Sequence, residues 1–146
     1  MIFRWVLVGL IWAFSASVIG ASPPDCRESL VLVGPYSSGK QLAPLARYRQ
    51  YQTIALITET PPEGYDYIQD DFDLVIPYRG ENHLVMAEQL LRLGPIRAVV
   101  PGSEWDPVLA DKLRDSLRRL GFESPGNTAH LAEARRDKSL LFEALS

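Results

Sequence analysis

The stretch VLVGPYSSGKQLAP, residues 31–44, sets the interpretation of the whole chain. Its apolar beginning is typical of a buried β-strand. The glycines and serines that follow indicate a loop, and the leucine- and alanine-containing end predicts the start of a helix. A strand that passes through such a loop into a helix is the unit from which parallel α/β sheets are built.

The loop in this stretch has the spacing of a phosphate-binding P-loop, with Gly34, Gly39 and Lys40 in the required order. Two residues argue against that assignment. Gln41 stands where a P-loop has the Ser or Thr that ligates magnesium. Pro35 lacks one of the backbone N–H groups that would surround a phosphate. A degenerate P-loop nucleotide site therefore stays an alternative hypothesis.

Beyond this stretch, short apolar runs alternate with longer amphipathic segments. Strands are expected at residues 30–33, 53–58, 72–76 and 96–100, and helices at residues 42–51, 83–93, 104–120 and 129–146. Asn82 is expected to cap the second helix, and Ser103 with Asp106 resembles a capping box for the third. The pattern predicts an α/β fold: an open parallel sheet with helices on both faces and a ligand site beyond the carboxyl ends of the strands. The loops of interest are therefore residues 34–40 and 101–106.

The composition is that of an ordinary globular chain of 146 residues, with room for one domain and a formal net charge of −3. The mild acidity provides no basic surface of the kind that nucleic-acid binding needs, so no nucleic-acid partner is expected. Cys26 is the single cysteine, which excludes an internal disulfide and a multi-cysteine metal site. No metal ligands are assigned.

Residues 1–24 differ from the remainder of the chain because Arg4 is their only charged side chain. The apolar stretch 5–14, followed by Ser17, Gly20 and Ala21, resembles a secretory signal peptide. The same uncharged run is just long enough to be an uncleaved membrane anchor. A third interpretation is an upstream extension of a cytosolic protein that starts at the wrong codon. Contact with a membrane is expected only through this leader.

Four segments, in order along the chain, resemble the N-terminal domain of the ATP-grasp carboxylate–amine ligases. GPYSSGKQLAP (34–44) is similar to Asp-Pro-Tyr-Ser-Ser-Gly-x-x-Leu-Ala-Pro, and FDLVIPY (72–78) is similar to one of the family's strands. VVPGSEWDPVLADKL (99–113) and GFESPGNTAHLAEARRDKSLLFEAL (121–145) match two further motifs. The resemblance implies a Rossmann-like pre-ATP-grasp domain at residues 28–127. Residues 128–146 would form a helix that leads into a missing ATP-grasp lobe.

This resemblance implies an ATP-dependent ligase that forms C–N bonds: ATP phosphorylates a carboxylate, and an amine then displaces the phosphate. ATP and Mg²⁺ would be cofactors of an intact parent enzyme, acting on a small carboxylate or amino-acid substrate. The family's acidic magnesium ligands and glycine-rich phosphate loop have no counterpart in this sequence. The chain alone is therefore expected to be a fragment, inactive and without a cofactor. It would need the ATP-grasp lobe, in cis or as a split subunit.

The resemblance also assigns residues to ATP. Lys138 and Arg136, in the segment RRDK, would contact ATP phosphate in an intact parent. In a chain without the opposite lobe, they would be solvated residues of a helix. No catalytic residue is assigned in this chain.

Two groups of residues are assigned to the substrate by the same resemblance. Ser37, Ser38 and Gly39 would offer hydroxyl and backbone donors to a carboxylate, although such a sequence is also typical of an ordinary turn. Tyr36, on the same loop, would stack over a small ligand or belong to a surface that docks onto the missing lobes. Glu104 would face the substrate amine, or would be a charge near a helix N-terminus that the helix dipole favours.

The sequence departs from the family's motifs at two positions. Gly34 stands where the family has Asp, and Asp106-Pro107 replaces Gly-Val. The first change removes a polar side chain at the end of a strand. The second adds a charge beside the expected substrate loop.

The leader and the family resemblance imply different locations. ATP-dependent ligases act in the cytoplasm, where ATP is available. A functional leader would instead export or anchor the protein, and the corresponding alternative is an exported or membrane-anchored small-molecule binding module without catalysis.

Overall fold

A computed structural model describes residues 27–58 and 66–130 of the chain. The strands in this part are β1 (Ser29–Val33), β2 (Gln52–Ile57), β3 (Leu74–Pro77) and β4 (Ile96–Pro101), and the α-helices are α1 (Leu42–Tyr48), α2 (His83–Leu93) and α3 (Pro107–Arg119). Single 3₁₀ turns lie at Ser38–Gln41 and Gln69–Asp71. The predicted α/β class is confirmed, and every expected strand is present.

All strand pairs in the sheet are parallel, and the strand order is β3-β2-β1-β4. The chain adds strands outward from β1 to β3 and then returns to place β4 on the other side of β1. The strand order therefore reverses between β1 and β4. In open α/β sheets, ligands bind beyond the carboxyl ends of the strands at such a reversal.

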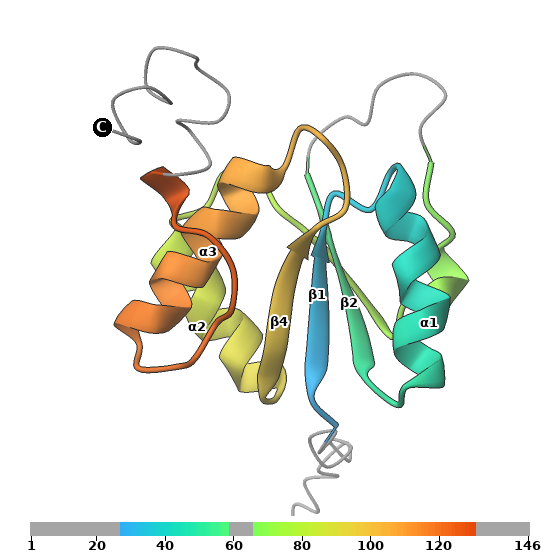
Figure 1. The fold of residues 1–146 in the computed structure, drawn as a ribbon, viewed down its shortest axis with the longest axis horizontal. Helices are drawn as coiled ribbons and strands as arrows, with labels where there is room; N and C mark the ends of the chain where they lie inside the picture. The colour runs from blue at the N-terminus through green and yellow to red at the C-terminus, as the bar shows by residue number, and fades with distance from the viewer. Residues whose placement is uncertain (1–26, 59–65, 131–146) are drawn as a thin grey trace, which may run out of the picture.

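Helices cover both faces of the sheet, with α1 on one face and α2 and α3 on the other (Figure 1). The larger core, towards α2 and α3, consists of Val31, Val33, Ile54, Leu56, Met86, Ala87, Leu90, Val99, Ala110, Leu113 and Leu117. The smaller core, towards α1, consists of Leu32, Ala43, Ala55 and Phe72. Neighbouring residues of β1 belong to different cores because side chains alternate across a strand.

The starts of α2 and α3 follow different local signals. Asn82 caps α2 as expected, and its side chain accepts a hydrogen bond from the Leu84 N–H at 2.8 Å. The expected capping box of α3 is wrong, because this helix begins at Pro107 and the Ser103 hydroxyl donates to the Asp106 carboxylate. Proline suits the first helical position because its missing N–H would have no partner there.

The ends of α1 and α3 depend on residues with positive φ. The helix expected at residues 42–51 ends earlier, at Tyr48, and Gln50 has a φ of 64°. Gly121 has a φ of 84° just after α3, where a glycine was expected to end the helix.

Two predictions fall largely outside the described residues. The leader, residues 1–24, lies wholly outside them, and only residues 129 and 130 of the helix expected at 129–146 are described. Within residues 27–58 and 66–130, no helix has the length and apolar character needed to cross a membrane.

Candidate functional site

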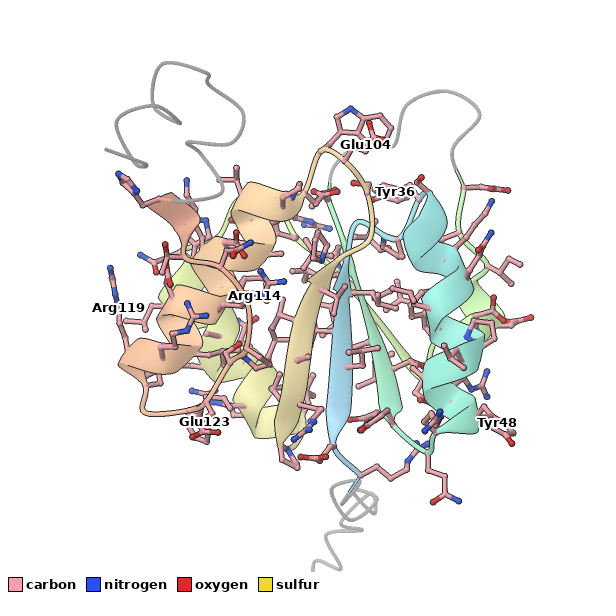
Figure 2. All side chains as sticks on the ribbon, viewed as in Figure 1. Tyr36, Tyr48, Glu104, Arg114, Arg119 and Glu123 are labelled. Atoms are coloured by element: carbon pink, nitrogen blue, oxygen red, sulfur yellow. The ribbon has the colours of Figure 1, made fainter. Side chains whose placement is uncertain are left out.

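The candidate site lies at the carboxyl ends of β1 and β4, where the strand order reverses. The first loop, residues 34–41, follows β1, and the second loop, residues 102–106, follows β4. Because β1 and β4 pair directly, the two loops leave the same end of the sheet as neighbours. In Figure 2, Tyr36 of the first loop and Glu104 of the second loop both lie at this end. The structure therefore brings together the two loops that the sequence singled out.

The two loops meet through backbone that leaves no room for side chains. The Gly102 N–H donates to the Val33 carbonyl at 2.7 Å, and the Gly39 N–H donates to the Gly102 carbonyl at 3.1 Å. A Cβ atom at Gly39 would overlap the Gly102 backbone, and one at Gly102 would lie 2.6 Å from the Cα atom of Pro35. Only glycine permits so close an approach of two backbones.

A buried carboxylate lies over the start of the first loop. Gly34 has a φ of 58°, in the region that favours glycine, and a Cβ atom there would overlap the Asp106 carboxylate. Asp106 is 6% exposed, and its carboxylate accepts a hydrogen bond from the Ser103 hydroxyl. The two positions at which the sequence departs from the ligase motifs are therefore in direct contact.

Tyr36 supports the first loop from inside the protein. Its side chain is 2% exposed, and its hydroxyl donates to the Thr58 carbonyl at 2.6 Å. Burial raises the pKa of Tyr36, hydrogen bonding with the Thr58 side chain opposes that shift, and the negative charge of Asp106 adds to the rise. Tyr36 was assigned to substrate binding, and the structure places its ring in the interior, away from the surface of the loop.

The second loop presents an acidic and an aromatic side chain to solvent. Glu104 is exposed, and Trp105 is 45% exposed. The Trp105 N–H donates to the Ser103 hydroxyl oxygen at 3.3 Å, which fixes the tip of the loop. Glu104 and Asp106 together make this loop acidic, so its charge is suited to a cationic group.

Several polar groups of the first loop are already used within the protein. The Gly39 N–H is bonded to the second loop, and the Lys40 N–H donates to the Ser37 carbonyl at 3.3 Å. The Lys40 ammonium lies 3.2 Å from the Asp66 carboxylate. A P-loop would direct its backbone N–H groups and its lysine at phosphate. This geometry disfavours the P-loop hypothesis, and Ser37 and Ser38 stay candidates for substrate binding.

A stacked aromatic pair lies near the carboxyl end of β3. The ring centroids of Tyr78 and His83 are 6.4 Å apart, and the Tyr78 hydroxyl donates to the Glu81 carbonyl at 2.9 Å. Burial lowers the pKa of His83, and the positive charge of Lys112 lowers it further. Burial raises the pKa of Tyr78, and the charge of Glu81 adds to that rise. Both effects on His83 favour its neutral form.

The motif residue Asp111 has a structural role. It is 1% exposed and pairs with Arg114, whose Nε donates to the Val99 carbonyl at 2.8 Å. Because β4 is an edge strand of this sheet, the pair satisfies a carbonyl that would otherwise face outward. A Cβ atom at Gly126 would lie 2.7 Å from the Arg114 guanidinium carbon, so the loop after α3 packs closely on this pair.

A hollow of about 880 Å³ lies at the opposite end of the sheet, beside the start of β4, and sequence analysis missed it. Its lining includes Arg97, Arg118, Phe122 and Ser124. The Ser124 hydroxyl is buried and has no hydrogen-bond partner among the described residues. The position of the segment after α3 depends on Arg118, which donates to the carbonyls of Ser124 and Gly126 at 2.8 and 2.7 Å.

The remaining predicted ligands concern ATP and metal. Lys138 and Arg136 lie outside the described residues, so their contact with ATP phosphate stays a prediction. In the described part of the chain, no three His, Cys, Asp or Glu side chains are grouped so as to hold a metal ion.

Comparison of the sequence with models of known protein families finds no match, and comparison with curated proteins finds none either. The structure by itself shows a parallel α/β fold, which many unrelated functions share. A function for this chain must therefore be argued from the two loops and the residues in them.

Proposed function

We propose that residues 28–127 are the N-terminal, substrate-side domain of an ATP-dependent carboxylate–amine ligase. One observation supports this above all. The two loops that carry the most specific ligase-like motifs meet at the point where the strand order of the parallel sheet reverses, and paired glycines join them. Topology alone would place a ligand there, and the motifs coincide with that place.

The reaction of such a ligase has two steps. A carboxylate oxygen attacks the γ-phosphorus of ATP, so that an acyl phosphate forms and ADP leaves. The nitrogen, as the neutral amine, then attacks the acyl carbon and forms a C–N bond. A proton leaves the nitrogen, and inorganic phosphate leaves with the bonding electrons of the broken C–O bond. The first step brings two anions together, which requires cationic groups such as Mg²⁺ to stabilise the transferring phosphate.

The described residues would contribute one wall of the site in this reaction. The junction of the two loops is close-packed, and Glu104 and Trp105 project from it. An exposed tryptophan beside a candidate site suits a surface that a second lobe covers. That lobe, in cis or as a separate subunit, would hold ATP and Mg²⁺, and Lys138 and Arg136 would reach the phosphates only in its presence.

The proposal can be tested by completing the enzyme. The coding DNA beside this chain is read in every frame for an ATP-grasp lobe, and the product is co-expressed with the full chain. ADP release is then measured with Mg²⁺-ATP and panels of small acids and amines. We expect release that needs ATP, an acid and an amine together, and no release from the 146-residue chain alone.

Matched variants make this experiment specific to the loops. Glu104→Gln removes an exposed carboxylate at the candidate site, whereas Glu123→Gln removes one at the far end of the sheet (Figure 2). We expect kcat/KM for the amine to fall about tenfold in the first variant and to stay unchanged in the second. Nucleotide turnover by the chain alone, or equal effects of the two variants, would contradict the proposal.

A further inference from the structure

The Asp106 carboxylate is largely buried and forms no ion pair with a basic side chain of the described residues. It is 6% exposed, and Ser103 is the only donor to it among the described residues. No lysine or arginine of the described part of the chain forms an ion pair with it, unlike Asp66, Asp111 and Asp115, which all pair with basic side chains. A largely buried carboxylate without a cation is costly unless a ligand supplies one.

The surroundings of Asp106 indicate why the carboxylate sits there. It occupies the space over Gly34 that a side chain at position 34 would otherwise fill. The backbone of Gly34 is held in place, because its N–H donates to the Leu56 carbonyl at 2.9 Å and its carbonyl accepts from the Tyr36 N–H at 2.7 Å. The Asp106 carboxylate thus packs against the hydrogen-bonded backbone of Gly34, at the point where the strand order reverses.

The contact between Asp106 and Gly34 involves both positions at which this chain departs from the ligase motifs. The motifs have a carboxylate at the position of Gly34 and a glycine at the position of Asp106, and this chain has the reverse. Because either side chain would occupy the same space, the junction has room for one carboxylate, supplied by one loop or the other.

Building on the proposed function, we infer that Asp106 binds the ammonium group of the amine substrate, and that positions 34 and 106 supply a single carboxylate between them. Charge supports a cationic ligand, because the exposed Glu104 lies two residues away and the loop carries no basic residue. The competing explanation is that Asp106 merely precedes α3, where a negative charge is favoured by the helix dipole.

The test is an NMR titration of the full ¹⁵N-labelled chain with glycinamide as the cationic probe and acetate as the anionic one. We expect glycinamide to shift the amide signals of Gly34, Ser103 and Trp105 in a saturable way, and acetate to leave them in place. Asp106→Asn keeps the size of the side chain but loses its charge, so it should weaken glycinamide binding about tenfold or more. Glu123→Gln should bind as the unmodified chain does.

An exchange of residues provides a second measurement. Gly34→Asp alone places two carboxylates in one space and should lower the melting temperature strongly. Combining it with Asp106→Gly should recover most of that loss and restore glycinamide binding. Equal binding by Asp106→Asn, no saturable shift with glycinamide, or an exchanged variant no more stable than Gly34→Asp would each overturn the inference.

The outcome can be separated from that of the ligase assignment. If glycinamide binds through Asp106 but no lobe completes an ATP-dependent ligase, the amine site stands and the proposed reaction fails. If the completed ligase is active and Asp106→Asn leaves its KM for the amine unchanged, the assignment of Asp106 fails alone.

Discussion

The two ends of the sheet are built in opposite ways. At the carboxyl end, two loops pack backbone against backbone through Gly39 and Gly102, and a carboxylate fills the space over Gly34. At the amino end, the segment after α3 stands away from β4 and leaves a hollow of about 880 Å³, with a buried hydroxyl that has no partner among the described residues. One end is close-packed, and the other is open.

The comparison shows that an open hollow and a binding site need not coincide. Binding sites are usually concave, but topology places the ligand of an open parallel sheet at the carboxyl ends of its strands. Here that end is close-packed and carries acidic groups, and under the proposed function a second lobe would complete the site. The hollow at the amino end is lined instead by Arg118 of α3, whose guanidinium donates to backbone carbonyls of the loop that follows this helix.

The largest loss of stability is expected from Gly102→Ala, which disturbs the close packing of the two loops at the carboxyl end of the sheet. The new Cβ would lie 2.6 Å from the Pro35 Cα atom and 2.9 Å from the Gly34 carbonyl oxygen, and backbone cannot move aside as a flexible side chain can. We expect the free energy of unfolding to fall by about 2–3 kcal/mol, measured by urea denaturation.

Gly80→Ala is the matched control for that substitution. Gly80 has a φ of 85°, and no atom lies within 4 Å of the position its Cβ would take, so the change adds backbone strain without a collision. It should cost about 1 kcal/mol. If Gly102→Ala lowers the free energy of unfolding no more than Gly80→Ala does, the two loops are not close-packed in solution.

At the amino end of the sheet, Arg118→Ala should lower the free energy of unfolding by less than Gly102→Ala does, although it removes the side chain that holds the loop after α3. Arg118 donates to the carbonyls of Ser124 and Gly126 and pairs with Asp115 at 2.7 Å, but its side chain is about one-third exposed. Loss of these bonds should lower the free energy of unfolding by about 1–2 kcal/mol, since water can replace part of them.

Arg119→Ala provides the comparison on the same turn of helix. Arg119 is exposed and projects away from the sheet (Figure 2), so its removal should change stability by less than about 0.5 kcal/mol. Equal losses in the two variants would mean that Arg118 does not hold the loop.

These differences also show how far sequence could predict the molecule. Continuous apolar runs such as TIALIT, residues 53–58, fix where strands lie, and Asn82 marks the start of α2 through a bond to its own helix. Those signals are local. The start of α3 was misplaced because the side chains of Ser103 and Asp106 bond to each other and Asp106 packs over Gly34, from a loop far away in the sequence.

The candidate site was predictable in position but not in construction. The motifs identified both loops, and parallel strands bring such loops to one end of the sheet. The pairing of β4 with β1, the burial of Tyr36 and the contact of Asp106 with Gly34 all depend on tertiary packing that no local pattern encodes.

A smaller, pH-dependent effect is expected from His83, near the carboxyl end of β3. Its pKa is lowered below the ordinary 6.5, chiefly by burial, so the unfolded chain binds the proton more readily than the folded protein does. Stability should therefore be fully present above pH 6.5 and should fall as the pH drops from there through the lowered pKa of the folded state.

Urea midpoints between about pH 5 and pH 7 measure this effect as a difference between proteins. His83→Gln should lose part of the pH dependence in that range, whereas His130→Gln, which removes an exposed histidine, should keep it. An unchanged pH dependence in His83→Gln would show that His83 is solvated in the folded protein.

The smallest effect should come from Ser124→Ala, which removes the buried hydroxyl beside the hollow at the amino end of the sheet. A buried hydroxyl without a hydrogen-bond partner loses its hydration on folding and gains no hydrogen bond in exchange. Its removal should therefore leave the free energy of unfolding unchanged or raise it by about 0.5 kcal/mol.

Ser29→Ala is the contrasting change at the same end of the sheet, because the Ser29 hydroxyl donates to Gln52 Oε1 at 2.7 Å and both residues are buried. Its loss should cost about 1–2 kcal/mol, since the Gln52 oxygen would be left unpaired. If both serines cost the same on substitution, the Ser124 hydroxyl has a partner in solution, such as bound water, and the amino end is less open than its geometry indicates.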